Sequence, residues 1–282
     1  MLIKFEDMHK TPENVSKKLC KFLKKSENMK RLLQPLILIG LLCSSITYAN
    51  LVDTVSMVKP SVVGIGVYTP TGRQKNQLNG TGFVVGDGTY IVTNNHVIDT
   101  ELDDNLLQKL AVFTGKGPAA KVRLATLVAT DEEHDLAILK IEGRALPALT
   151  LAKNDFIKEG SSIAFTGFPI GAVLGLYPVT HRGIIAAVTP TIIPVDDSRQ
   201  ISIAMLKRLR DPYLVYQLDA TAYPGNSGSA MYDVKTGEVV GVINKVFVQQ
   251  SKETVISKPS GITYAIPVKY LHKLLKKHNI KS

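Results

Sequence analysis

Short runs of apolar residues, many of them β-branched and separated by turn residues, cover most of the chain after residue 60. Strands of this length and spacing are typical of a barrel or a sandwich, so we predict an all-β fold. A first set of strands is expected at 61–68, 80–85, 90–94, 110–114, 121–129 and 136–141. A second set is expected at 162–166, 183–188, 214–219, 229–232, 239–246 and 262–268.

Three segments have helical rather than strand periodicity. Residues 50–58 form a short helix that Pro60 stops, and residues 269–277 place leucines on one face and lysines on the other. The pattern at 198–210 predicts a short amphipathic helix inserted between two strands. We expect the first two helices at the ends of the folded region. We expect the third to offer its apolar face to a substrate, another subunit or a membrane, and the alternative is that it packs on the second barrel.

The N-terminal part of the chain has the pattern of an export signal. Residues 29–31, Met-Lys-Arg, give the segment a basic start, and residues 32–42 are apolar. Small residues stand at the last and third-last positions before Asn50. This pattern predicts a signal peptide at 29–49, preceded by a basic extension at 1–28, and a periplasmic or secreted product. The alternative is a retained membrane anchor through residues 32–46.

Cysteine and charge exclude several kinds of site. The two cysteines, Cys20 and Cys43, precede the predicted cut, so the mature chain has no disulfide and no zinc-thiolate site. We expect no metal and no other cofactor. Residues 1–49 hold nine Lys or Arg against four Asp or Glu, which is half of the net charge of +10. The remaining excess is partly in the C-terminal lysines, so we expect no nucleic-acid partner.

Candidate chemistry lies in the stretch 221–231, Thr-Ala-Tyr-Pro-Gly-Asn-Ser-Gly-Ser-Ala-Met. Glycines around Ser227 allow a tight turn in which the N–H groups of Gly225, Asn226 and Ser227 point into one concavity. Such donors stabilise the oxyanion that forms when a serine attacks a carbonyl. A simple surface turn is the alternative for this stretch taken alone.

A nucleophilic serine also needs a base and a group that orients the base. His96 ends a predicted strand, where its side chain can reach a cleft, and Asp135 opens a strongly apolar strand. The resulting chain order of His, Asp and Ser is one of the known orders for a catalytic triad. A core histidine and a strand-edge cap are the alternatives for these two residues taken singly.

Five segments in one order resemble the signatures of trypsin-like serine proteases of the HtrA/Deg group. They are Gly-Thr-Gly-Phe-Val-Val at 80–85, Thr-Asn-Asn-His-Val at 93–97, His-Asp-Leu-Ala-Ile-Leu-Lys at 134–140, Gly-Asn-Ser-Gly at 225–228 and Gly-Ile-Thr-Tyr-Ala-Ile-Pro at 261–267. The resemblance covers about residues 50–270. It implies two six-stranded antiparallel β-barrels of chymotrypsin-like fold, at 50–150 and 151–268, with a C-terminal helix and tail at 269–282.

The same resemblance implies a serine endopeptidase that works through an acyl-enzyme. His96 and Asp135 then come from the first barrel and Ser227 from the second, with proteins or peptides as substrates, above all unfolded or misfolded envelope proteins. A substrate pocket is implied at Thr221, Val242, Ile243 and Asn244. Because Thr221, at its floor, carries no charge, we expect cleavage after small or medium aliphatic residues.

Some features depart from the family or stay outside the proposed chemistry. Ser229 stands where the family has glycine, no segment of PDZ size follows, and the connection 189–216 is longer than usual. We expect His134 to be exposed beside Asp135 and His181 to be structural. An α/β-hydrolase fits poorly, since its serine precedes the acid and histidine. The competing function from another class is a binding or chaperone-like module with little turnover.

Overall fold

A computed structural model shows how the strands of residues 49–282 pair into sheets. The structure describes residues 50–73, 75–117, 120–153, 155–169, 176–191, 212–244 and 262–281. The predicted signal peptide at 29–49, the extension at 1–28 and the helix at 198–210 lie outside the described residues.

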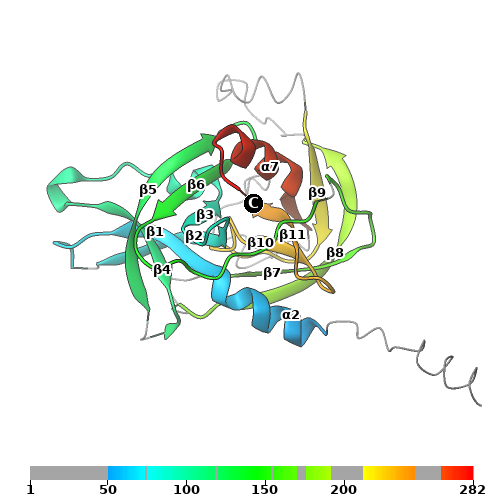
Figure 1. Cartoon of the computed structure of the whole chain (residues 1–282), viewed down its shortest axis with the longest axis horizontal. Coiled ribbons are helices and arrows are strands. Elements are labelled where there is room, and N and C mark those ends of the chain that lie inside the picture. The colour runs from blue at the N-terminus through cyan, green and yellow to red at the C-terminus, as the bar shows by residue number, and fades with distance from the viewer. Residues whose placement is uncertain are drawn as a thin grey trace, which may run out of the picture. The chain divides into compact units, whose positions relative to one another are not determined.

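The first six strands close into an antiparallel barrel, in the order β1-β2-β3-β6-β5-β4 (Figure 1). Their bounds are β1 (Val62–Tyr68), β2 (Asn76–Val85), β3 (Tyr90–Thr93), β4 (Lys109–Thr114), β5 (Lys121–Asp131) and β6 (Leu136–Ile141). β2 begins four residues before its predicted start, because its pairing with β1 continues beyond a bulge at Ile65/Gly66.

The next six strands close a second antiparallel barrel, in the order β10-β11-β12-β9-β8-β7. Their bounds are β7 (Ser162–Gly167), β8 (Val179–Pro190), β9 (Leu214–Asp219), β10 (Ala230–Asp233), β11 (Val239–Asn244) and β12 (Ile262–Pro267). The predicted fold class, two six-stranded barrels with short terminal helices, is therefore confirmed.

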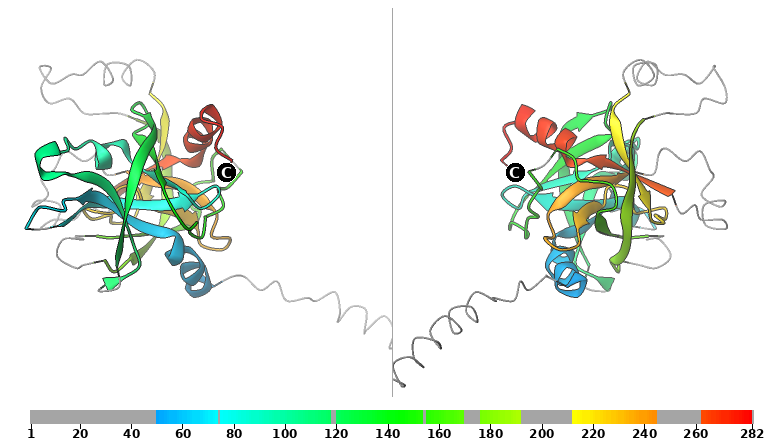
Figure 2. Two further views of the ribbon diagram at one scale, coloured as in Figure 1. Left: turned by 60° about the vertical axis from the view of Figure 1, so that its left-hand side comes forward. Right: turned by 90° about the vertical axis from the view of Figure 1, so that its right-hand side faces the viewer.

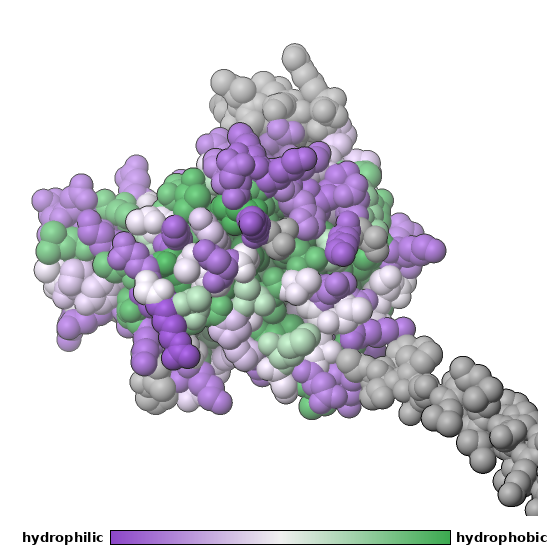
Figure 3. Space-filling view, viewed as in Figure 1, coloured by the Kyte–Doolittle hydropathy of each residue, from purple (hydrophilic) through white to green (hydrophobic). Residues whose placement is uncertain are grey.

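Within the described ranges, helices lie at the ends of the barrels and in one connection. They are α2 (Leu51–Val58), the 3-10 turns η1 (Lys59–Ser61) and η2 (Asp104–Leu106), the single turn α3 (Asn95–Ile98) and α7 (Val268–Lys277). α7 continues directly from β12, packs against β5 and β11, and is seen from two further directions in Figure 2. Its buried residues include Leu271, Leu274 and Leu275, while the surface over it is hydrophilic (Figure 3). No helix in the described part of the chain is long and apolar enough to span a bilayer.

One apolar cluster spans both barrels, and a second lies within the first barrel. A single cluster of buried side chains includes Phe83 and Val92 from the first barrel with Phe165, Tyr216 and Val242 from the second. Every residue of β11 is buried, which explains its unbroken apolar sequence. Because close-packed interiors hold their elements rigidly, this shared core fixes the loops of one barrel against those of the other.

Candidate active site

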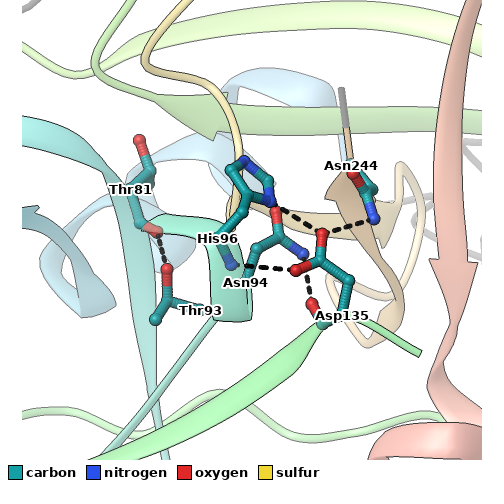
Figure 4. Close-up of polar contacts among 6 residues, drawn as sticks. All are labelled: Thr81, Thr93, Asn94, His96, Asp135 and Asn244. Carbon is teal, nitrogen blue, oxygen red and sulfur yellow. Dashed lines mark hydrogen bonds and ion pairs between the residues drawn. The ribbon is translucent and has the colours of Figure 1, made fainter. Parts of the chain in front are cut away.

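Asp135 and His96 form a hydrogen-bonded pair in the first barrel (Figure 4). His96 Nδ1 lies 2.7 Å from Asp135 Oδ2, and the His96 backbone N–H donates to Asp135 Oδ1 at 2.9 Å. The Asp135 side chain is 10% exposed, whereas that of His96 is 35% exposed. The carboxylate thus holds the imidazole from the protein side and leaves the rest of the ring accessible.

Local structure explains how these two residues meet. His96 lies in α3, the single turn that follows β3, and Asp135 directly precedes β6, which pairs with β3. The Asp135 carbonyl accepts hydrogen bonds from the Asn94 amide at 3.0 Å and from the Asn95 N–H at 3.2 Å. Asp135 has φ of 53°, a left-handed conformation that aspartate tolerates better than most residues.

A third residue contacts the carboxylate from the second barrel. Asn244, at the end of β11, is fully buried, and its Nδ2 donates to Asp135 Oδ2 at 2.8 Å. We expected Asn244 in the substrate pocket, and its amide instead faces Asp135. The signal for this role was an amide at the end of an otherwise apolar strand, since a buried amide requires a polar partner.

The loop that carries Ser227 begins with a tight turn. The Asn226 N–H donates to the Tyr223 carbonyl at 3.0 Å, with Pro224 second and Gly225 third in the turn. Gly225 has φ of 98°, so this is a type II turn, whose third position requires positive φ. Of the three N–H groups that we expected to serve an oxyanion, that of Asn226 is therefore used inside the turn.

Ser227 itself is 6% exposed and lies against the first barrel. Its carbonyl accepts a hydrogen bond from the Thr81 N–H at 2.9 Å. A Cβ at Gly80 would lie 2.8 Å from Val97, the neighbour of His96, and 3.1 Å from the Ser227 carbonyl oxygen. Gly80 therefore lies between the Val97 side chain and the Ser227 backbone, where a larger residue would not fit.

Gly228 allows the chain to pass this close to the first barrel. Its φ is 85°, and a Cβ there would lie 2.1 Å from the Thr81 carbonyl oxygen. Its N–H donates to the Ile243 carbonyl at 2.9 Å, and the Ser229 N–H donates to the Asn226 carbonyl at 3.0 Å. Ser229 therefore continues the loop into β10 with its side chain fully buried.

The residues expected in the substrate pocket lie in different environments. Val242 and Ile243 are fully buried and belong to the shared apolar core. Thr221 is partly exposed. Its two neighbours are braced by Thr263, whose hydroxyl donates to the Ala220 carbonyl at 2.6 Å and accepts from the Ala222 N–H at 3.0 Å. Of the four residues, Thr221 alone combines partial exposure with a place on the loop leading to Ser227.

The expectation that His134 is exposed is wrong. Its side chain is 15% exposed, its Nδ1 lies 2.7 Å from Asp131 Oδ2, and its ring stacks on that of Tyr270 at 4.1 Å. Burial alone would raise the pKa of Asp131, but its hydrogen bonds with His134 bring the pKa below the usual range. Tyr270 belongs to α7, so a residue far along the chain covers this turn.

His181 has the structural environment that we expected. It pairs in register with Phe165 across β7 and β8, and the two rings stack at 5.0 Å. Its Nε2 is buried and has no hydrogen-bond partner among the described residues. Burial lowers the pKa of His181 from 6.5, because the charged imidazolium would lose its hydration.

This lowered pKa predicts a loss of stability in mild acid. Below pH 6.5 the unfolded chain binds a proton at His181 that the folded chain resists, so the free energy of unfolding falls as the pH drops. Stability measured by denaturant unfolding between pH 7 and pH 5 should fall less in His181→Leu than in the parent. The matched control is His278→Leu, at an exposed position after α7. Equal pH slopes in the parent and His181→Leu would contradict this assignment.

Comparison with known proteins identifies the family. Residues 80–242 match the family model described as a trypsin-like peptidase domain. The chain is 30% identical over 202 residues to a periplasmic serine endoprotease, DegP-like, of Hahella chejuensis. It is 31% identical over 190 residues to its counterpart in Halomonas elongata. These matches cover 71% and 67% of this chain, but only 35% and 32% of the relatives.

Solved structures agree with the sequence matches. The serine endoprotease from Yersinia pestis superposes with a TM-score of 0.56 at 28% identity, over 82% of this chain and 66% of that one. Deg5 superposes with a TM-score of 0.55 at 26% identity, over 79% of this chain and 90% of that one. With the two barrels and the family match over more than half of the chain, the protein belongs to the trypsin-like peptidase domain family and is of the HtrA type.

Proposed function

We propose that this chain is a serine endopeptidase whose nucleophile is Ser227, with His96 as general base and Asp135 as the residue that orients His96. One observation carries the proposal: the His96 ring is held by a buried carboxylate at 2.7 Å, and Val97, the next residue, lies against the same glycine, Gly80, as the Ser227 carbonyl. A triad requires this arrangement, in which the base is oriented by a third group and the nucleophile lies on a neighbouring segment.

In the first half of the reaction, Ser227 Oγ attacks the scissile carbonyl carbon, and its proton passes to His96 Nε2. Asp135 accepts the hydrogen bond from His96 Nδ1–H and stabilises the imidazolium. The carbonyl oxygen becomes an oxyanion held by the N–H groups of Gly225 and Ser227. Removal of one such donor typically costs about 3 kcal/mol in the transition state.

In the second half, the tetrahedral species collapses and the peptide C–N bond breaks. His96 gives its proton to the leaving amine, and the acyl group remains as an ester on Ser227 Oγ. A water molecule then gives a proton to His96 and attacks the ester carbonyl carbon. The ester C–Oγ bond breaks, His96 returns the proton to Ser227 Oγ, and the new carboxyl terminus leaves. Atoms and charge balance without a metal or a redox partner.

The relatives indicate where the enzyme works and on what. The DegP-like proteins that match are described as periplasmic endoproteases. We infer that this chain is exported by the signal peptide at 29–49 and cleaves protein substrates in the envelope, above all unfolded ones. Since the chain spans 35% of the length of the first of these relatives, this place and substrate class are our proposal for the present chain.

Digestion of an unfolded protein tests this function. Parent enzyme incubated with casein should produce new internal termini, which mass spectrometry of the fragments detects, while intact Ser227→Ala produces none. Trimming from the chain ends alone would contradict an endopeptidase. Binding of casein without cleavage, under several conditions of temperature and salt, would favour the competing binding or chaperone-like module.

The fragments from the same digestion report the primary specificity. Thr221, six residues before Ser227, is uncharged, and its neighbours are tied to Thr263. A pocket without a carboxylate does not stabilise a buried Lys or Arg side chain, so cleavage is expected after small or medium aliphatic residues. A profile with mainly Lys or Arg before the cleaved bond would contradict the role given to Thr221.

A further inference from the structure

Three hydrogen bonds join Thr81 in β2 to residues of the second barrel. It is fully buried in the first barrel, yet its N–H donates to the Ser227 carbonyl at 2.9 Å. Its hydroxyl donates to the Gly225 carbonyl at 2.6 Å and accepts from the Phe168 N–H at 3.0 Å. One threonine side chain therefore connects the strand next to β3 with both the nucleophile loop and the end of β7.

The contacts of Thr81 inside its own barrel make this connection stiff. The Thr81 carbonyl accepts the hydroxyl of Thr93, the last residue of β3 (Figure 4). His96 follows β3 by three residues. Displacement of β2 would therefore move the segment before His96 together with the loop that carries Ser227.

The Thr81 hydroxyl contacts the part of the loop where the positions of the proposed oxyanion donors matter most. Gly225 and Ser227 supply the proposed oxyanion donors, and the Thr81 side chain holds the carbonyl of the first while its backbone holds the carbonyl of the second. In the same peptide group as the Gly225 carbonyl, the Asn226 N–H donates to the Tyr223 carbonyl. A hydroxyl that donates to one barrel-2 group and accepts from another fixes the loop against His96, whereas an apolar side chain of the same shape does neither.

We propose that Thr81 is a positioning residue of the active site, whose hydroxyl sets the oxyanion donors and Ser227 in register with His96. This inference rests on the proposed function. It assigns to Thr81 no contact with the substrate. Its effect comes through alignment, and misplacement of reacting groups by about 1 Å can cost about 100-fold in rate.

The test compares variants that differ by one hydroxyl. Thr81→Val keeps the shape of the side chain but leaves the Gly225 carbonyl and the Phe168 N–H without their partner, whereas Thr81→Ser keeps the hydroxyl. We expect Thr81→Val to lower kcat on a peptide substrate by about 10- to 100-fold, with KM within about twofold. Thr81→Ser should stay within about threefold of the parent. Should the valine variant fold poorly, Thr81→Ala and Thr81→Ser form a second pair that differs by one oxygen.

Two further readouts separate positioning from a general loss of structure. Titration with a serine-directed phosphonate gives both the fraction of enzyme that reacts and the rate constant of that fraction. Positioning lowers the rate constant, whereas partial unfolding lowers the fraction. The pH at which the rate is half-maximal should not change, because none of the Thr81 hydrogen bonds given above involves His96 or Asp135.

Thr54→Val is the matched control. Thr54 is also buried, and its hydroxyl donates to the Val234 carbonyl at 2.9 Å, away from the nucleophile loop. The Thr54→Val variant should be less stable than the parent, with the same kcat per active molecule. The inference is overturned if Thr81→Val keeps the parental rate constant, or if its loss is entirely a loss of reactive fraction. A parent that shows neither cleavage nor labelling of Ser227 overturns the proposed function, and the inference with it.

Discussion

Replacement of Ser227 by alanine is expected to remove protease activity, with a fall in kcat of about 10⁶-fold to the background level. The change deletes the attacking oxygen and nothing else, since the backbone contacts of residue 227 with Thr81 do not involve its side chain. Cleavage of casein, followed with fluorescent peptides released over hours, measures the loss. Thermal unfolding and secretion should match the parent.

His96→Ala provides an independent route to the same loss. It removes the base while Ser227 and its loop stay in place, because the loop is held through Thr81, Ile243 and Tyr223 rather than through the imidazole. A double variant should be no worse than either single variant, since the groups of a triad act as a unit. Activity within a few-fold of the parent in either single variant would contradict the triad.

The second large effect is expected for Asp135→Asn, with a fall in kcat of about 10⁴-fold. The carboxylate accepts from His96 Nδ1–H, from the His96 N–H and from Asn244 Nδ2. An amide there offers N–H donors to a ring nitrogen, which favours the tautomer that cannot take a proton from Ser227. Asparagine also tolerates the positive φ of 53° at this position, so the backbone need not change.

Asp131→Asn is a close control for this variant. Asp131 also lies 2.7 Å from a histidine Nδ1, that of His134, and accepts the N–H of the same residue at 3.1 Å. It belongs to the same turn but contacts neither His96 nor Asn244 among the described bonds. Steady-state kinetics should place Asp131→Asn within about twofold of the parent. Similar losses in both variants would mean that the turn, and not the Asp135 carboxylate, matters.

Much of the fold could be predicted from short-range patterns. Alternating and continuous apolar runs located the strands, because the side chains that a strand buries are apolar and follow its own period. Closure into two barrels came from the family resemblance instead, since pairing partners such as β1 and β4 are separated by about forty residues. The single turn α3 was missed because four residues are too few to show a helical period.

The sequence indicated candidate site residues but not their surroundings. Motif order indicated His96, Asp135 and Ser227, and the structure pairs the first two. The amide of Asn244 faces Asp135 only because the second barrel docks on the first, a fact that no local pattern contains. His134 is covered by Tyr270 of α7, which lies 136 positions later in the chain, so its burial was equally invisible to a local argument.

Reaction with a peptidyl phosphonate that carries valine at its reactive end tests the central claim most directly, because such a reagent bonds to a serine only when a base and oxyanion donors activate it. Intact mass should show one adduct per chain, and fragment masses should place it on Ser227. His96→Ala should react at least about 100-fold more slowly, within the range expected for loss of a general base. An adduct on Ser229 or another residue, or equal labelling of the parent and His96→Ala, would contradict the assignment of Ser227 as the activated nucleophile.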